Sequence, residues 1–147
     1  MENRFATVSF SAFMLVGIAG CSSSPPAAPP QPGTLPSGTA QTTINDANAA
    51  TTYAVRCTSA ETLVTINTGD PAAGATAVVD NERNLDVKWV SIHNLGGFTG
   101  SYWKDLQGRA DVSMVGKTYT ITGVAEGFNT DNPGATKLGT FAIKVSC

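Results

Sequence analysis

The amino-acid sequence predicts an all-β fold: a small antiparallel β-sandwich or barrel-like domain that follows a disordered tether. Two observations predict it. Residues 53–147 are rich in Val, Ile and Thr, with Gly and Asn between short apolar runs, and they lack helical periodicity. Residues 22–52 hold six of the eight prolines and one charged residue, Asp46. Such a stretch buries too little apolar surface to offset the entropy cost of ordering.

Residues 1–20 have the pattern of an export signal peptide. Their apolar run, FATVSFSAFMLVGIAG, follows Arg4 and is interrupted by hydroxyl side chains. It is shorter than the ~20 apolar residues that span a bilayer. It ends in Ala19 and Gly20, and small residues of this kind precede a peptidase cleavage site. Glu2 offsets the charge of Arg4, so the positive region that normally opens such a signal is weak.

A cysteine follows the apolar run directly. Ile18-Ala19-Gly20-Cys21 resembles the lipobox of bacterial lipoproteins. The resemblance implies cleavage between Gly20 and Cys21, a diacylglyceryl thioether on Cys21, and often an amide-linked acyl chain such as palmitate on its freed amine. Two or more acyl chains, at ~0.8 kcal/mol per buried methylene, hold a protein firmly in a membrane. The alternatives are a chance cysteine at the end of a signal and an apolar segment that stays uncleaved.

Residues 21–52 are expected to form a lipidated tether rich in Pro, Ala, Ser and Thr, disordered and partly in the polyproline II conformation. At ~3.1 Å per residue, the tether would hold a domain several tens of ångströms from the membrane. Four threonines near prolines are candidate sites of O-glycosylation, with plain solvated side chains as the alternative. These are Thr34, Thr39, Thr42 and Thr43.

Residues 53–147 are long enough for one small domain. Eight short runs of strand-like composition recur along them, separated by turn signals such as Thr68-Gly69-Asp70-Pro71 and Asn94-Leu95-Gly96-Gly97. Strands spaced in this way are typical of a β-sandwich or a barrel. The expected strands are YAVRC, ETLVTI, ATAVVD, DVKWVSIHN, FTGSYW, ADVSMV, KTYTITGVA and GTFAIKVSC.

The chain has three cysteines, and an odd thiol in an exported protein needs an explanation. Lipidation of Cys21 supplies one and leaves Cys57 and Cys147 as a pair, which would close in an oxidising compartment. Cys147 has the strand parity of Val145, and Cys57 has that of Val55, so both sulfurs are expected to point into the core. A bridge around about 90 residues stabilises a fold by roughly 4–5 kcal/mol through chain entropy.

The last third of the chain carries a family resemblance. Tyr119-Thr120-Ile121-Thr122-Gly123-Val124-Ala125-Glu126-Gly127, Pro133 and Phe141-Ala142-Ile143-Lys144-Val145-Ser146-Cys147 resemble the carboxy-terminal half of the mycobacterial 19-kilodalton lipoprotein antigen family. The resemblance implies an envelope-anchored, often mannosylated lipoprotein with a small β-rich domain and no agreed enzymatic activity. It also implies that host innate lipid-sensing receptors detect the acyl chains on Cys21. The tether here is richer in Pro and Ala than the antigen's and its threonines are less clustered.

Residues suited to catalysis or metal binding are few. Ser91 and His93, the single histidine, share a strand face, but no GxSxG elbow accompanies them and a hydrolase is not expected. One histidine and two paired cysteines do not suit zinc. A run of alternating oxygen ligands faintly resembles a calcium loop, but Leu85 replaces its glycine, so a solvated turn is expected. The run comprises Asp80, Glu82, Asn84 and Asp86.

An aromatic stretch, Gly96–Asp105, contains the candidate ligand contacts. In a strand, Phe98 and Tyr102 face one way and Trp103 the other, so one face can present an aromatic ring to a sugar or an acyl chain. The alternative is that Trp103 covers a sheet edge or packs under a loop. Trp89 alternates with Val87 and is expected in the core.

The sequence therefore predicts a cell-membrane lipoprotein, lipid-anchored on the extracytoplasmic side of the envelope, with a non-enzymatic binding or antigen-like β domain over residues 53–147. The alternative is a lipid or glycolipid carrier with an apolar cavity in that domain. The expected partners are the membrane, through acyl chains on Cys21, and host innate receptors or an envelope glycolipid. Lys and Arg are scattered singly, so nucleic-acid binding is not expected, and neither is a cofactor or a metal.

Overall fold

The computed structural model describes residues 25–147, and every regular element in this part of the chain is a β-strand. None of the described residues forms a helix long and apolar enough to span a membrane. The strands are β1 (Ala40–Ile44), β2 (Ala47–Thr52), β3 (Val55–Ala60), β4 (Leu63–Gly69), β5 (Gly74–Asp80), β6 (Asp86–Leu95), β7 (Phe98–Trp103), β8 (Arg109–Val115), β9 (Thr118–Asn129) and β10 (Asn132–Ser146).

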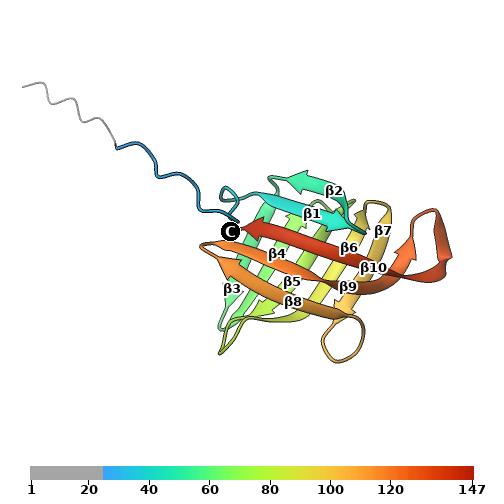
Figure 1. The fold of residues 1–147 in the computed structure, drawn as a ribbon. Coiled ribbons are helices and arrows are strands. Elements are labelled where there is room, and N and C mark those ends of the chain that lie inside the picture. The colour runs from blue at the N-terminus through green and yellow to red at the C-terminus, as the bar shows by residue number, and fades with distance from the viewer. Residues whose placement is uncertain (1–24) are drawn as a thin grey trace, which may run out of the picture.

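The ten strands form one antiparallel sheet in the order β2-β1-β10-β9-β7-β6-β5-β4-β3, with β8 paired to β9 beside this path. Strands β3 to β7 form a meander, in which each strand pairs with the next along the chain. The sheet curls into a nearly closed barrel, crossed by the long β9–β10 ribbon (Figure 1). The predicted all-β, barrel-like fold is confirmed, and each of the eight expected runs contributes a strand.

The core fills the inside of the curled sheet. Alternate side chains point inward along the strands that line the core, as in Val64, Ile66 and Thr68 of β4. Phe98 of β7 is 1% exposed, and its ring leaves room only for glycine at two neighbouring positions: a Cβ on Gly100 or Gly139 would meet ring atoms at 2.6 and 2.7 Å. The interior is therefore occupied by the protein's own side chains.

The domain begins earlier than predicted. Residues 40–52, which the composition assigned to the tether, form β1 and β2. Strand β1 pairs with β10 from Ala40↔Val145 to Ile44↔Phe141 and turns Ala40, Thr42 and Ile44 inward. Strands β1 and β2 consist mainly of Ala and Thr and contain one large apolar residue, Ile44, so their composition resembles that of a tether. The ladder to β10 supplies the backbone hydrogen bonds and buried surface that order them.

Strands β2 and β3 are consecutive in the chain yet lie at the two ends of the sheet, so a seam separates them. The structure joins Cys57 of β3 to Cys147, after β10, by a disulfide with a Cα–Cα distance of 5.8 Å. One end of the sheet is thereby linked covalently to the strand next to β1 at the other end. The backbone N–H of Gly38 donates to the carbonyl of Ser146 at 2.9 Å, which fixes the entering chain beside the C-terminus.

Candidate functional site

The predicted cleavage and lipidation site, Gly20 and Cys21, lies outside the described residues. Both assignments therefore stay predictions. The structure does describe the predicted glycosylation sites. Thr39 and Thr42 are buried, at 6% and 2% exposure, and cannot carry a glycan in the folded domain without displacing the core side chains that cover them. Thr34 and Thr43 are partly exposed and remain candidates.

The outer surface of the meander β3–β7 carries both aromatic and hydrogen-bonding side chains. Strand register places polar residues side by side across the five strands, through the pairs of β3 with β4, β4 with β5, β5 with β6 and β6 with β7. Neighbouring strands lie ~4.8 Å apart, so donors and acceptors recur at that spacing. This polar row consists of Arg56, Asn67, Thr76, Ser91 and Ser101.

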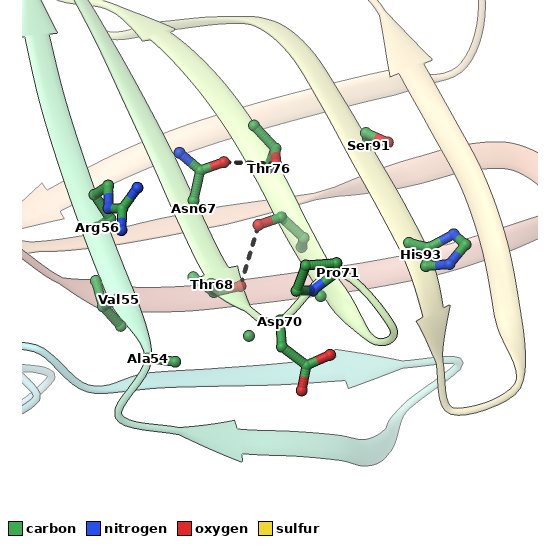
Figure 2. Close-up of a pocket in the computed structure, with 13 residues that line it drawn as sticks. Ala54, Val55, Arg56, Asn67, Thr68, Asp70, Pro71, Thr76, Ser91 and His93 are labelled. Atoms are coloured by element: carbon green, nitrogen blue, oxygen red, sulfur yellow. Dashed lines mark hydrogen bonds between the residues drawn. The ribbon is translucent and has the colours of Figure 1, made fainter.

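Part of the polar row lines a hollow of about 530 Å³ at the β4–β5 turn (Figure 2). The hydroxyl of Thr76 donates to Oδ1 of Asn67 at 2.9 Å, which orients the amide. Asp70 holds the turn, because its carboxylate accepts from the backbone N–H groups of Ala72 and Ala73 at 2.8 and 3.0 Å. Arg56 and Asp70 are the oppositely charged residues of the lining, so the hollow has no net charge from these groups.

Ser91 and His93 both line the hollow, as their shared strand face predicts. A nucleophile and its base need a side-chain hydrogen bond of about 2.6–3.2 Å. Figure 2 draws these two side chains apart along β6, with no hydrogen bond between them. The arrangement lacks the geometry of a serine–histidine catalytic pair.

A β-bulge moves Trp89 to the outer face, so the prediction that it belongs to the core is wrong. Strand β6 pairs Val78 with Trp89 but Val79 with Val87, which leaves Lys88 as an extra residue. The extra residue reverses the parity between Val87, which is buried, and Trp89. The Nε1–H of Trp89 is itself buried, without an acceptor among the described residues.

Trp89 pairs across the strands with Trp103, and the ring centroids are 5.3 Å apart at an interplanar angle of 50°. Trp103 is 45% exposed, as expected for an aromatic presented on one strand face. We call these two residues the tryptophan pair. Its outer surface lies next to Ser91 and Ser101 of the polar row, since each serine is two residues from one of the tryptophans along its strand.

Phe98 and Tyr102, the other two candidate ligand contacts, point into the core with 1% and 5% exposure. Their assignment as contacts is incompatible with this burial, whereas the predicted division between the two strand faces is correct. The hydroxyl of Tyr102 donates to the carbonyl of Val87 at 3.3 Å, and burial raises the pKa of this phenol. It therefore stays protonated as a donor that ties β7 to β6.

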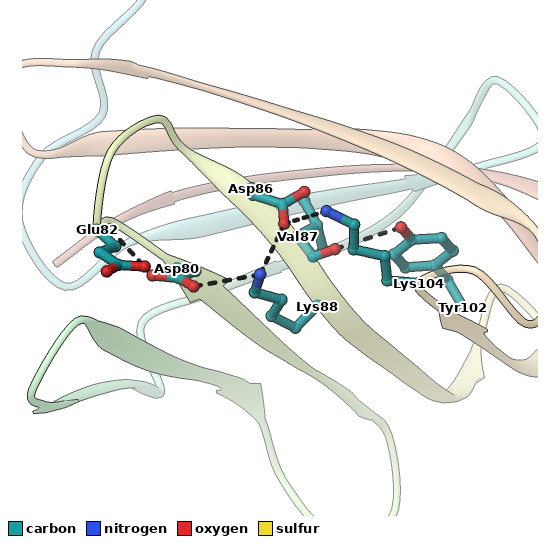
Figure 3. Close-up of polar contacts among 7 residues, drawn as sticks. All are labelled: Asp80, Glu82, Asp86, Val87, Lys88, Tyr102 and Lys104. Carbon is teal, nitrogen blue, oxygen red and sulfur yellow. Dashed lines mark hydrogen bonds and ion pairs between the residues drawn. The ribbon is translucent and has the colours of Figure 1, made fainter.

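The expected solvated turn between β5 and β6 carries an ion-pair cluster (Figure 3). Lys88 Nζ lies 3.2 Å from Asp80 and 2.9 Å from Asp86, and Lys104 also pairs with Asp86. A hydrogen bond from the backbone N–H of Glu82 lowers the pKa of Asp80, with further contributions from Lys88. Hydrogen bonds from Lys104 and Lys88 lower the pKa of Asp86.

These carboxylates are thus neutralised by lysines rather than arranged around a cation. No group of three or more His, Cys, Asp or Glu side chains within residues 25–147 could hold a metal ion. Sequence reasoning missed the polar row, because its members come from five strands and gather only through register. It also missed the position of Trp89, since a bulge leaves no mark in the apolar pattern.

Known proteins resemble this chain closely. A profile of the family described as Mycobacterium 19 kDa lipoprotein antigen matches residues 33–147, a span that includes β1 and β2. A putative lipoprotein of Mycobacterium avium subsp. hominissuis is 36% identical over 148 residues, covering 100% of this chain and 97% of the relative. The probable lipoprotein LppE of Mycobacterium tuberculosis is 29% identical over 150 residues, covering 100% of both chains. Lipoprotein LpqH of Mycobacterium bovis is 36% identical over 97 residues, or 65% of this chain and 61% of LpqH.

Proposed function

This chain belongs to the Mycobacterium 19 kDa lipoprotein antigen family, and on that premise we propose that it is an envelope lipoprotein whose β domain is displayed outside the membrane for binding rather than catalysis. Acyl chains on Cys21 anchor it after cleavage behind Gly20. The observation that carries the proposal is the family match over residues 33–147, which follows the lipobox-like Cys21 in the sequence. The relatives reported above are all named as lipoproteins, and none of the names states an enzymatic activity.

The way the chain enters the barrel supports display. The backbone N–H of Leu35 donates to the hydroxyl of Thr118 at 3.0 Å, and this bond attaches the entering chain to the start of β9. Thirteen residues separate Cys21 from Leu35, and they would span ~40 Å if extended as polyproline II. In Figure 1 the entering chain and the C-terminus lie at one end of the barrel, and the tip of the β9–β10 hairpin lies at the other. An anchor at Cys21 would leave that hairpin free to face outward.

The filled interior supports display over the carrier alternative. A carrier needs an apolar cavity, whereas the interior of this barrel holds a cluster of buried hydrophobic side chains in which Phe98 packs against Gly100 and Gly139. The hollow on the outer face has Arg56, Asn67 and His93 in its lining, which suits polar ligands better than an acyl chain. We therefore propose that contacts with other molecules are made on the outside of the barrel.

Mass spectrometry of the protein purified from its native envelope tests the anchor. The denatured mass should equal the chain from Cys21 onward plus one diacylglyceryl group, with or without a third acyl chain on the freed amine. A Cys21→Ser variant should lose these acyl chains and its membrane attachment, and it should also lose activation of host lipid-sensing receptors. A Cys147→Ser variant is the control for loss of a cysteine, since it breaks the disulfide with Cys57 and not the anchor, and its denatured mass should keep the acyl chains. An unmodified chain beginning at Met1 would refute the proposal.

The same preparation distinguishes display from transport. Under native conditions the display proposal expects no tightly held lipid beyond the covalent acyl chains. A stoichiometric noncovalent lipid that survives delipidating washes would favour the carrier. This readout is independent of the covalent mass, so either part of the proposal can fail alone.

A further inference from the structure

The outer face of β3–β7 combines an exposed aromatic surface with a row of hydrogen-bonding side chains. The tryptophan pair is an apolar platform, with Trp103 45% exposed and its ring centroid 5.3 Å from that of Trp89. Large aromatic side chains gain free energy when buried, so an exposed one on a folded domain is a candidate contact surface.

The polar row lies directly beside this platform. Ser91 and Ser101 are cross-strand partners, and each lies two residues along its strand from one tryptophan of the pair. Thr76 and Asn67 continue the row into the hollow. Gln107 holds one end in place, because its Nε2 donates to the carbonyl and to the hydroxyl of Ser101 at 2.9 Å each. Hydroxyl and amide groups therefore recur every ~4.8 Å next to an aromatic surface.

The charges of this face select against an ionic ligand. Arg56 and Asp70 have opposite signs in the lining of the hollow. Beyond the tryptophans, the cluster of Asp80, Asp86, Lys88 and Lys104 contains equal numbers of acids and bases that pair with one another. A neutral ligand rich in hydroxyl groups matches such a surface, since it needs hydrogen bonds but no counter-charge.

We propose that this face is a binding site for a neutral saccharide chain. Sugar rings have apolar C–H faces and hydroxyl edges, so one ring stacks on Trp103 while the edges of the next rings bond to the polar row. The hollow of about 530 Å³ falls within the ~300–1,000 Å³ that ligand sites occupy. The proposal names the ligand class for the binding role proposed above, and it stands or falls separately from the lipid anchor.

The chain contains two tryptophans, and both belong to the proposed site, so intrinsic fluorescence reports on this face alone. The experiment titrates the full mature protein, in micelles of a detergent without a sugar head group, with neutral oligosaccharides of four to six units. The probes are linear glucans, mannan, galactan and arabinan fragments. At least one should change the tryptophan emission saturably, with a dissociation constant between about 10 µM and 1 mM.

Variants locate the site by calorimetry with the same probe. Trp103→Ala should weaken binding about tenfold or more, because the stacking surface is lost. Ser91→Ala and Thr76→Ala should each weaken it about two- to fivefold. Leu138→Ala is the matched control, since this side chain is 63% exposed on β10, outside the site, and its removal should leave the affinity unchanged.

Three results would overturn the proposal. One is the absence of any emission change with every probe at concentrations up to about 10 mM. Another is binding that survives Trp103→Ala unchanged. The third is selective quenching of both tryptophans by a brominated acyl lipid, with no response to saccharides, which would assign the face to lipid. None of these outcomes alters the covalent mass at Cys21, so failure here is distinguishable from failure of the anchor.

Discussion

The two halves of the barrel are built in different ways. In the meander β3–β7, every ladder joins strands that are neighbours in the chain, and the connections are short turns. The other half, which closes the barrel, contains β1, β2 and β8 to β10. There β1 pairs with β10, so that Ala40 lies opposite Val145. Pairing residues so far apart in the sequence closes a long loop, which costs more chain entropy than closing a hairpin. The meander can therefore form from local pairings, whereas closure depends on contacts made late and over long distances.

The closing half carries the reinforcements that this cost requires. The disulfide Cys57–Cys147 spans 90 residues of sequence across the seam. Backbone hydrogen bonds from Gly38 to Ser146 and from Asn45 to Thr140, both 2.9 Å, hold the ends of β1 against β10. We expect the domain to lose stability chiefly where the two halves meet, and four changes test this from the largest effect to the smallest.

Removal of the disulfide should have the largest effect. A Cys57→Ser/Cys147→Ser double variant frees a loop of 90 residues in the unfolded chain, which lowers the free energy of unfolding by about 4–5 kcal/mol. Urea denaturation followed by circular dichroism measures this loss. Reduction of the wild type with a thiol should give the same midpoint as the double variant. A loss below ~1 kcal/mol would mean that the seam is held by packing alone.

Loss of a core side chain of β1 should have the second largest effect on stability. Ile44 is 4% exposed and lies opposite Phe141, so Ile44→Ala should cost about 2–4 kcal/mol. Hydrogen exchange should show amides of β1 and β2 losing protection before those of β4 to β6, because their ladder depends on this contact. Uniform loss of protection across all strands would show that the two halves unfold as one unit.

Local signals explain how much of the fold the sequence predicts. The sequence predicts the eight strands from β3 to β10, because each segment contains its own apolar alternation and turn residues, as in Phe141, Ile143 and Val145. It does not predict strands β1 and β2, since Ala40 and Thr42 become core residues only by pairing with β10. Long-range pairing, rather than any property of residues 40–52, turns this segment into strand.

The outer face was harder still to predict. The division of Phe98 and Tyr102 from Trp103 follows from strand parity and is correct. The same parity rule fails at Trp89, because the bulge at Lys88 inserts one residue between Val87 and the tryptophan. The polar row needs the register of five strands, and no single segment contains that information.

The contact between the two halves can be tested at Gly139 on β10. A Cβ there would lie 2.7 Å from the ring of Phe98 on β7, so Gly139→Ala should destabilise by about 1–3 kcal/mol. Gly134→Ala is the matched control, because nothing lies within 4 Å of its Cβ position. In a Phe98→Leu background the penalty of Gly139→Ala should shrink. An equal penalty in both backgrounds would place the strain in the backbone of β10 instead.

The smallest effect should come from the ion pairs within the meander. Asp86 has a pKa below its ordinary 3.8, first because Lys104 donates a hydrogen bond to it and then because Lys88 does. Its charge therefore contributes stability above pH 3.8, and this contribution is lost as the pH falls through the lowered pKa. Both lysines are partly exposed, so Asp86→Asn should cost at most about 1 kcal/mol at pH 7. Thermal denaturation between pH 2 and 7 should show the wild-type and variant curves converging below pH 3.8, and 0.5 M salt should narrow the gap at pH 7. A gap that persists at pH 2 would mean that Asp86 acts through packing, and the meander would then rely on specific side-chain contacts as much as the seam does.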